Sequence, residues 1–291
     1  TKHLIYETKS SDNVQNILEE NYVQMNLQSK SEMESYTVDV IIPTYRPDHK
    51  FGVLMKMLRK QTYEPRKVII LNTIPQSDSP EKVRREQEEY METYRELNHA
   101  TIVPINQNEF DHGGTRNQGA MMSDADLILF MTQDAIPADE FVIEELVKQF
   151  RNKKVAAAYA RQLVHGNADE IENFTRVFNY PAESRIKTKA DLKTLGIKTF
   201  YCSNVCAMYR KSVYEKLGGF VKHTIFNEDM IYASKLINAN YAVVYVAEAK
   251  VFHSHSYTYI QQLRRNFDLA VSQAQYPEVF QQVSSESEGF R

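Results

Sequence analysis

Short apolar runs alternate with helical segments along the first part of this chain, and this alternation is what most limits its fold. Strands are predicted at residues 38–42, 67–71, 101–105, 127–131 and 155–160. Helices are predicted between them, at 52–61, 79–98, 113–123 and 138–151. Strand–helix–strand units at this spacing form parallel sheets with right-handed crossovers. The chain is therefore predicted to be an α/β protein with a mostly parallel central sheet flanked by helices.

The second half of the chain is less regular. Its predicted elements are a strand near 199–209, a helix at 212–217, a helix from 228 to about 238, a strand at 242–246 and a final helix at 257–273. Because no repeat or low-complexity linker separates the halves, we expect one main domain over 37–260. A helical N-terminal extension is expected over 1–36, and a C-terminal helix and tail over 261–291.

Composition excludes several classes of protein. A formal net charge of −3 argues against a nucleic-acid partner held by a general electrostatic field. The sequence lacks an apolar run of the ~20 residues that span a bilayer, and its first residues lack the apolar core of a signal peptide. Cys202 and Cys206 are predicted to share one strand, where a disulfide is geometrically poor. Reduced thiols in a cytosolic setting are therefore expected.

The apolar run from Leu127 to Met131 ends abruptly at Thr132, Gln133 and Asp134. Such a run fits a strand covered on both faces, and ligands of open α/β sheets bind outside the carboxyl ends of these strands. Asp134 is therefore a candidate ligand for a divalent metal and for the phosphates that the metal bridges. That Asp134 simply caps the following helix is an equally good explanation of this motif taken alone.

Two loops carry groups suited to a phosphate-bearing ligand. The segment Pro43-Thr44-Tyr45-Arg46 follows the first strand and offers backbone N–H groups and a cation, although an ordinary turn explains it as well. The segment 111–117, DHGGTRN, has two glycines that let the backbone approach a ligand closely. Seven polar or glycine residues between two apolar runs are unusual packing material. A functional role is therefore favoured for this second loop.

Two later segments carry carboxylates and imidazoles. Asn227, as an N-cap, places Glu228 and Asp229 in a first helical turn, where the helix dipole favours their charged forms. One carboxylate is a candidate general base, although acids also belong at helix N-termini without any catalysis. His253 and His255 would point to one side of an extended segment and can ligate a divalent metal, or form a polar surface instead.

In their order along the chain, these motifs resemble an inverting family 2 glycosyltransferase of the GT-A fold. The ordered set is TYRP, the Asn72-Thr73 pair, DHGGTRN, TQDA, NED and HSH. DHGGTRN and TQDA resemble the bacterial rhamnosyltransferase branch in particular, and the resemblance extends from about Val38 to Asp268. It implies a Rossmann-like nucleotide-binding half and an acceptor-binding half within a catalytic domain over 37–260.

The resemblance also implies roles for individual residues. The nucleotide sugar would be bound by Pro43, Thr44, Arg46, Asn72, Asp111, Gly114, Arg116, Asn117, Gln133 and Arg265. Asn72 departs from the family pattern, which usually has an acidic residue at the end of the second strand. The metal-binding D-x-D appears as Gln133-Asp134-Ala135, so Asp134 would hold Mg²⁺ or Mn²⁺ together with His255, ahead of His253. Asp229 is the implied catalytic base, with Glu228 beside it.

The activity implied by the resemblance is transfer of L-rhamnose, with inversion, from dTDP-β-L-rhamnose. The acceptor would be a hydroxyl of a lipid-linked cell-wall or capsular polysaccharide, reached from the cytoplasm at the inner face of the cell membrane. A UDP-hexose or UDP-N-acetylhexosamine donor is an alternative that the motifs leave open. A non-catalytic carbohydrate-binding module with a platform of exposed tyrosines is a further alternative. A nucleotidyltransferase would need a glycine-rich, lysine-containing loop, which PTYRP is not.

Overall fold

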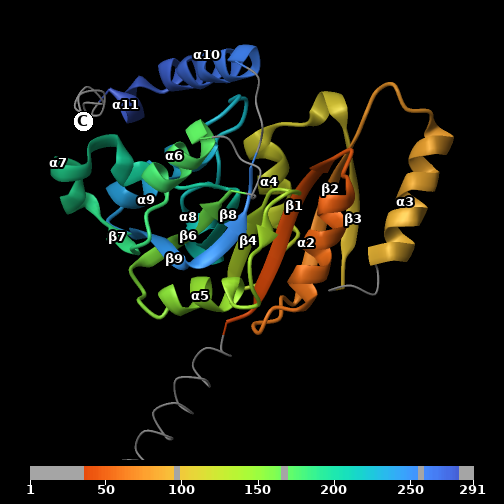
Figure 1. The fold of residues 1–291 in the computed structure, drawn as a ribbon, viewed down its shortest axis with the longest axis horizontal. Coiled ribbons are helices and arrows are strands. Elements are labelled where there is room, and N and C mark those ends of the chain that lie inside the picture. Colours follow the sequence, from red (N-terminus) through yellow and green to blue (C-terminus); the bar gives the residue numbers. More distant parts are fainter. Residues whose placement is uncertain (1–35, 95–98, 165–169, 255–258, 282–291) are drawn as a thin grey trace, which may run out of the picture. The chain divides into compact units, whose positions relative to one another are not determined.

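The computed structural model describes residues 36–94, 99–164, 170–254 and 259–281 (Figure 1). Almost all of the predicted N-terminal extension, the end of the predicted tail and His255 lie outside these described residues. The described strands are β1 Val38–Tyr45, β2 Lys67–Ile74, β3 Thr101–Asn106, β4 Leu127–Met131, β5 Ile136–Pro137, β6 Val155–Leu163, β7 Arg185–Lys187, β8 Cys206–Arg210 and β9 Ala242–Phe252. The described α-helices are α2 His49–Arg59, α3 Pro80–Tyr94, α4 His112–Met121, α5 Val142–Gln149, α6 Glu170–Asn179, α7 Leu192–Leu195, α8 Lys211–Lys216, α9 Glu228–Asn238, α10 Tyr259–Gln275 and α11 Pro277–Phe280.

The strands form one sheet in the order β3-β2-β1-β4-β8-β6-β9-β5, with β7 paired to β9. The predicted parallel pairing holds throughout β3-β2-β1-β4. Every residue of β4 is buried, as expected for a strand covered on both faces. The carboxyl ends of β1, β2 and β4 therefore meet at one edge of the sheet, where the polar loops of the sequence begin.

Beyond β4 the sheet is mixed. Strand β8 is antiparallel to both β4 and β6, whereas β6 and β9 are parallel, and β5 and β7 run antiparallel to β9. These additional strands extend the sheet beyond β4 and form its second half. The α/β prediction is confirmed, with antiparallel strands concentrated in this second half.

Three sequence predictions are corrected by the structure. The strand expected near 199–209 is confined to β8, because Gly196–Phe200 is a 3₁₀ turn and the backbone N–H of Asn204 turns away to a carboxylate of α9. Cys202 and Cys206 therefore do not share a strand, and both are free and buried. Helix α5 begins at Val142 rather than near 138, because Ile136–Pro137 pairs with β9. Helix α6, Glu170–Asn179, is an additional helix that the sequence did not predict.

An aromatic cluster fills the core between the sheet and helices α8 and α9. Tyr209 on β8 lies at its centre, 5.7 Å from the Phe130 and Tyr232 rings and 5.6 Å from Phe220 in edge-on geometry. Such pairs each contribute about 0.5–1.5 kcal/mol beyond their buried area. The Tyr209 hydroxyl donates a hydrogen bond to Asn204 Oδ1 at 2.8 Å, so the cluster supports the polar loop above it.

Candidate active site

The ends of β1 and β4 are joined by the side chain of Gln133. Its Oε1 accepts the backbone N–H of Tyr45 at 2.7 Å, and its Nε2 donates to the Tyr45 carbonyl at 3.1 Å. On the other side of β1, the Thr44 hydroxyl donates to Asn72 Oδ1 at 3.0 Å, and both side chains are buried. Four residues predicted at these strand ends are thus brought together: Pro43, Thr44, Asn72 and Gln133. Pro43 is a residue of β1, and the hydrogen bonds of the other three fix the shape of the loops.

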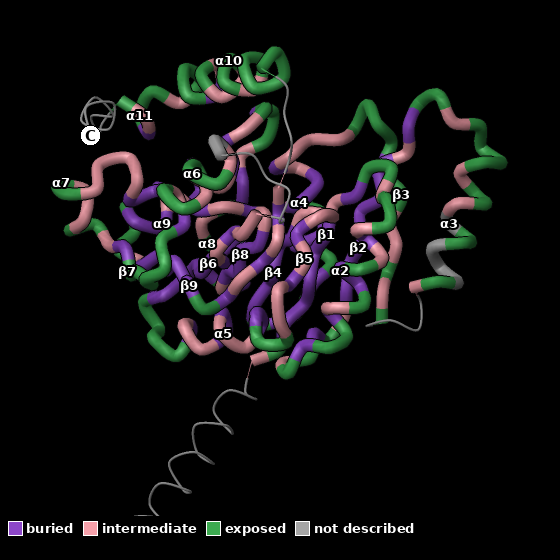
Figure 2. Tube along the Cα trace, viewed as in Figure 1, coloured by how far each residue is buried: buried purple, intermediate pink, exposed green. Residues whose placement is uncertain are grey.

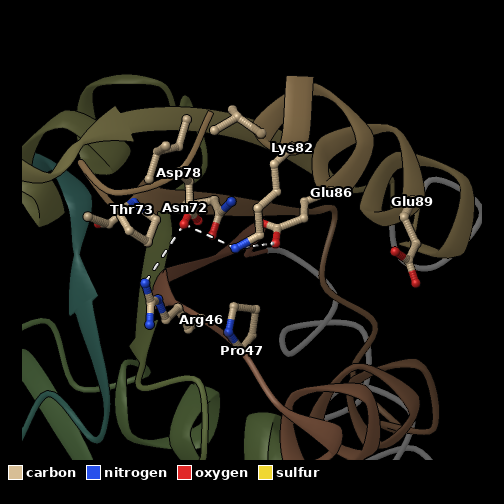
Figure 3. A pocket seen from close by; sticks show the side chains of 11 residues that line it. Arg46, Pro47, Asn72, Thr73, Asp78, Lys82, Glu86 and Glu89 are labelled. Carbon is tan, nitrogen blue, oxygen red and sulfur yellow. Dashed lines mark hydrogen bonds and ion pairs between the residues drawn. The ribbon is translucent and has the colours of Figure 1, made fainter. Parts of the chain in front are cut away.

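A pocket of about 420 Å³ opens beside these strand ends (Figure 3). Arg46 and Asn72, both predicted from the sequence, contribute to its wall together with residues of α3. The side chain of Asp78 lies between two cations, 3.8 Å from Arg46 NH2 and 3.0 Å from Lys82 Nζ. Asp78 therefore supplies a carboxylate six residues after Asn72, where no sequence motif marked one.

The DHGGTRN segment forms the start of α4 and is tied to the loop before α9. Asp111 is the N-cap: one oxygen accepts the N–H of Gly114 and the other accepts the N–H of His223 at 2.7 Å. Asn117 donates to the Phe220 carbonyl at 2.9 Å and accepts the Phe220 N–H at 3.0 Å. These side chains hold two loops together, so the unusual polarity of the segment has a structural cause.

Gly113 allows the close approach of these two segments. A Cβ at this position would collide with the carbonyl oxygen of Val221. The sequence pointed to Gly114 as the residue that a ligand approaches. The structure shows that Gly113 is the glycine against which the second half of the chain packs.

Arg116 lies with the carboxylates of α9. Its NH1 is 3.4 Å from Glu228 Oε1, and the two side chains are 7% and 8% exposed. The same guanidinium donates to the His112 carbonyl at 2.9 Å, while its Nε has no hydrogen-bond partner among the described residues. The ion pair neutralises Glu228 within the protein, which a buried carboxylate requires.

Asp229, the predicted base, lies in the first turn of α9 as expected. Asn227 occupies the N-cap position in the left-handed conformation, but its side chain makes no capping bond. The Asp229 carboxylate accepts the backbone N–H of Asn204 at 3.1 Å and that of Met230 at 2.8 Å. Burial, followed by repulsion from Glu228, raises the pKa of Asp229 to about 7. A carboxylate with this pKa can both take up and release a proton near neutral pH.

His253 lies beside Asp134, with 3.7 Å between Nε2 and Oδ1. The other ring nitrogen, Nδ1, is 3.0 Å from Gln162 Oε1. The same Gln162 oxygen also accepts from Arg176 NH1, and an arginine can only donate, so the atom facing both partners must be the amide oxygen. Nδ1 therefore carries the proton.

This tautomer leaves the lone pair of His253 on Nε2, on the side of Asp134. In the reverse tautomer, Nδ1 and Gln162 Oε1 would both be acceptors and would face each other at 3.0 Å. Arg176 NH2 could donate to Nδ1 in that tautomer, but this contact is longer, at 3.4 Å, and so weighs less in the assignment. An imidazole lone pair next to a carboxylate oxygen is a donor set that suits Mn²⁺ or Mg²⁺. Asp134 and His253 therefore fit a metal site, whereas His255 lies outside the described residues.

The loop before β8 connects these groups. The Asn204 side chain donates to Glu228 Oε1 at 3.2 Å, and its backbone N–H binds Asp229. On either side, the Ser203 hydroxyl accepts from Gln162 at 3.0 Å, and the Val205 carbonyl accepts the N–H of Thr132 at 3.1 Å. This loop thus contacts the carboxylates of Glu228 and Asp229, the Gln162 side chain that binds His253, and the segment that carries Asp134. Neither Asn204 nor Gln162 stands in a recognisable motif, so their positions could not be found from the sequence.

Arg265 on α10 lies over the Phe226 ring, with 4.9 Å between the guanidinium carbon and the ring centroid. The Phe226 ring is also stacked with His112, with 6.0 Å between the ring centroids, and burial lowers the pKa of this histidine. The structure therefore places the predicted cation next to the loop that leads into Glu228 and Asp229.

Residues 39–218 match the Glycosyl transferase family 2 domain. The chain belongs to glycosyltransferase family 2. This family 2 enzyme is 41% identical over 256 residues to the O-antigen chain rhamnosyltransferase RfbN of Salmonella typhimurium, covering 87% of this chain and 78% of that protein. It is 40% identical over 262 residues to the O-antigen chain rhamnosyltransferase WbaN of Salmonella anatum, covering 89% and 79%. The family match rules out the alternative of a non-catalytic binding module.

A solved structure with the same fold is the mannosyltransferase PcManGT from Pyrobaculum calidifontis in complex with GDP-Man and Mn²⁺. The TM-score is 0.60 at 17% identity, over 84% of this family 2 enzyme and 65% of the mannosyltransferase. The chain thus spans just under two thirds of that protein. The predicted GT-A fold is confirmed by this similarity and by the family match.

Proposed function

We propose that this family 2 enzyme transfers L-rhamnose from dTDP-β-L-rhamnose to a hydroxyl group of a growing lipid-linked polysaccharide, with inversion at the anomeric carbon. The rhamnosyltransferase relatives support the donor, since both are about 40% identical across most of the chain. The observation that carries the mechanism is Asp229, a buried carboxylate whose pKa is raised to about 7.

Asp229 acts as the general base. Its two N–H donors, from Asn204 and Met230, fix the orientation of the carboxylate. A proton on the acceptor hydroxyl passes to Asp229 as the oxygen attacks the anomeric carbon from the side opposite to the departing diphosphate. Glu228 stays paired with Arg116 and raises the basicity of Asp229 through its charge. Inversion follows from a single in-line displacement.

The nucleotide lies at the carboxyl ends of β1 and β2. Arg46 and Asn72 line the pocket there, and the Asp78 carboxylate supplies the acceptor that relatives of this family usually carry at the end of the second strand. Thr44 and Gln133 hold the loop backbone in place for the diphosphate. Arg265 approaches from α10, over Phe226 in the loop that leads into Glu228 and Asp229.

Asp134 and His253 would hold a divalent ion, Mn²⁺ or Mg²⁺. Among the residues that the structure describes, no cluster of three metal-ligating side chains occurs. When bound, such an ion offsets the negative charge that develops on the departing diphosphate. Loss of Mn²⁺ binding in His253→Ala, with binding retained in His255→Ala, is the expected result. The opposite result would assign the ligand to His255.

A donor screen tests the proposal. Release of nucleoside diphosphate is measured from dTDP-β-L-rhamnose, UDP-glucose and UDP-N-acetylglucosamine, each with Mn²⁺ or Mg²⁺. Turnover of the dTDP-sugar well above both UDP-sugars is expected, together with a rise in melting temperature with dTDP plus Mn²⁺. Turnover confined to the UDP-sugars would overturn the rhamnosyl assignment and leave the family 2 assignment intact.

A further inference from the structure

Helix α10 turns its apolar side to solvent. Four large apolar side chains on this helix are exposed: Tyr259 (87%), Ile260 (65%), Leu263 (70%) and Phe267 (69%). At about 100° per residue they share one stripe of the helix surface. The opposite side is polar and faces the domain, since the buried Ser272 hydroxyl contacts the Thr224 hydroxyl at 2.9 Å and donates to the Phe226 carbonyl.

Helix α6 has the same reversed arrangement. Its outer side carries Phe174 (73% exposed), Val177 (67%) and Phe178 (53%), spaced three and four residues apart. Its inner side carries Arg176, which donates to Gln162 beneath the helix. In Figure 2 much of the tube along α10 and α6 is coloured as exposed, in contrast to the buried strands. Exposed large apolar side chains arranged in this way mark an interaction surface.

Both helices lie against the candidate active site. Helix α6 follows β6 and supports His253 through Arg176 and Gln162. Helix α10 follows β9 and contacts the loop that leads into Glu228 and Asp229. Both are found on the upper side of the sheet in Figure 1. The inner sides of both helices, through Arg176 and Ser272, therefore contact residues that support the site.

The charges beside the apolar faces are positive. Arg264 is exposed on α10, and Lys198 Nζ lies 4.3 Å from the centroid of the Phe178 ring on α6. The carboxylate of α10, Asp268, is half-buried, and Glu172 of α6 lies 3.9 Å from Arg176 on the inner side. The described side chains of these two faces therefore combine apolar residues and cations without an exposed carboxylate. This combination fits the headgroup region of an anionic bilayer.

We propose that the outer faces of α6 and α10 dock on an anionic phospholipid bilayer and bring the site to an acceptor held at the lipid surface. The inference rests on the proposed function, in which the acceptor is lipid-linked. In the part of the chain that the structure describes, no helix is long and apolar enough to cross a membrane. Docking through these two faces supplies bilayer contact without a spanning segment and points the loop of Asp229 toward the membrane.

Vesicle flotation tests the proposal with the full chain. The wild type is mixed with phosphatidylcholine vesicles with and without phosphatidylglycerol, and vesicle-bound protein is measured. Binding to the anionic vesicles is expected. The double variant Leu263→Glu/Phe267→Glu should reduce the partition coefficient about a hundredfold, since each of the two apolar side chains that lose burial accounts for a factor of about ten. The control is Met121→Glu, since Met121 is 77% exposed and lies at the other end of the sheet. Its place there follows from the next residue, Met122, whose carbonyl accepts a hydrogen bond from Lys67 at the start of β2. This variant should float like the wild type.

Two results would overturn the docking proposal. One is a wild type that fails to float with anionic vesicles, and the other is a double variant that floats as well as the wild type. Sedimentation velocity without lipid identifies an interface between two copies of this chain, because the double variant would then dissociate a dimer. Donor hydrolysis in the absence of lipid is measured alongside and should be unchanged in the double variant. A wild type that floats but fails to use dTDP-rhamnose would refute the proposed function and leave bilayer docking intact.

Discussion

The two halves of the sheet use polar side chains in different ways. In the first half, Asp111 and Asn117 have their oxygens occupied by backbone N–H groups and hold two loops in place. In the second half, Asp229 and His253 are also held by hydrogen bonds, and they are the proposed base and a proposed metal ligand. Asp229 keeps a carboxylate with a raised pKa, and His253 keeps the Nε2 lone pair beside Asp134.

This difference shows that polarity in a conspicuous motif does not by itself mark the reacting groups. The second half contributes Asp229, the proposed base, and His253, a proposed metal ligand, while the other proposed metal ligand, Asp134, follows β4 of the first half. Replacing a carboxylate by an amide should therefore have different consequences in the two halves. It should act on stability in the first and on catalysis in the second.

The largest effect is expected at Asp229. Asp229→Asn preserves the shape of the side chain but removes its basicity, so kcat should fall by about 10²–10⁴-fold, the usual contribution of a general base. Binding of dTDP plus Mn²⁺, measured by calorimetry, should stay close to wild type. Near-normal turnover by this variant would remove Asp229 from the role of base.

The next effect is expected at Gln162, which orients His253 without being a ligand. Gln162→Ala removes the acceptor of the Nδ1 proton and should lower Mn²⁺ affinity by about 10–100-fold, as for other groups that orient a metal ligand. Mn²⁺ binding is measured by electron paramagnetic resonance in the presence of dTDP. Gln162→Glu, which keeps acceptor oxygens facing His253 and Arg176, is the matched control. Equal affinity in the wild type and the alanine variant would contradict the tautomer assignment.

A stability effect is expected where the halves meet. Gly113→Ala introduces a Cβ against the Val221 carbonyl and should lower the free energy of unfolding by about 1–3 kcal/mol. Gly52→Ala on α2 is the control, because its Cβ would lie 3.6 Å from the Tyr94 hydroxyl, an ordinary contact. There alanine should stabilise the helix by up to about 1 kcal/mol. Denaturant titration of both variants measures the contrast, and equal stabilities would show that Gly113 is not a packing site.

The smallest effect is expected at Asp111. Asp111→Asn keeps one acceptor oxygen for α4 and loses the other, so the free energy of unfolding should fall by about 0.5–1.5 kcal/mol. Because the charge of Asp111 takes no part in proton transfer, kcat should remain close to wild type. A drop in kcat as large as that of Asp229→Asn would erase the distinction between the two halves.

The sequence predicted the first half of the fold closely because its signals are local. Apolar runs such as Leu127–Met131, and the capping serine Ser79 ahead of α3, identify elements without reference to distant residues. The second half depends on distant contacts: Asn204 leaves the β8 ladder to bind Asp229, and Ile136–Pro137 pairs with β9 instead of entering a helix. No local pattern encodes such pairings.

The site follows the same division. The order of the motifs predicted Asp134 as a metal ligand and Asp229 as the base, and both roles stay proposals. The supporting residues Gln162, Asn204 and Asp78 come from segments without a motif, so their positions required the folded chain. Arg116 was expected at the nucleotide and is found paired with Glu228, a contact between segments more than a hundred residues apart.

The pH dependence of kcat/KM tests the central claim most directly, because it reports ionisation of the free enzyme. With its pKa raised to about 7, Asp229 is protonated and inactive below this pH and ionised above it. The rate with dTDP-rhamnose and acceptor should therefore rise as pH increases through about 7, and this rise should be absent from the residual activity of Asp229→Asn. A rising limb of the same midpoint in the variant would show that another group is the base.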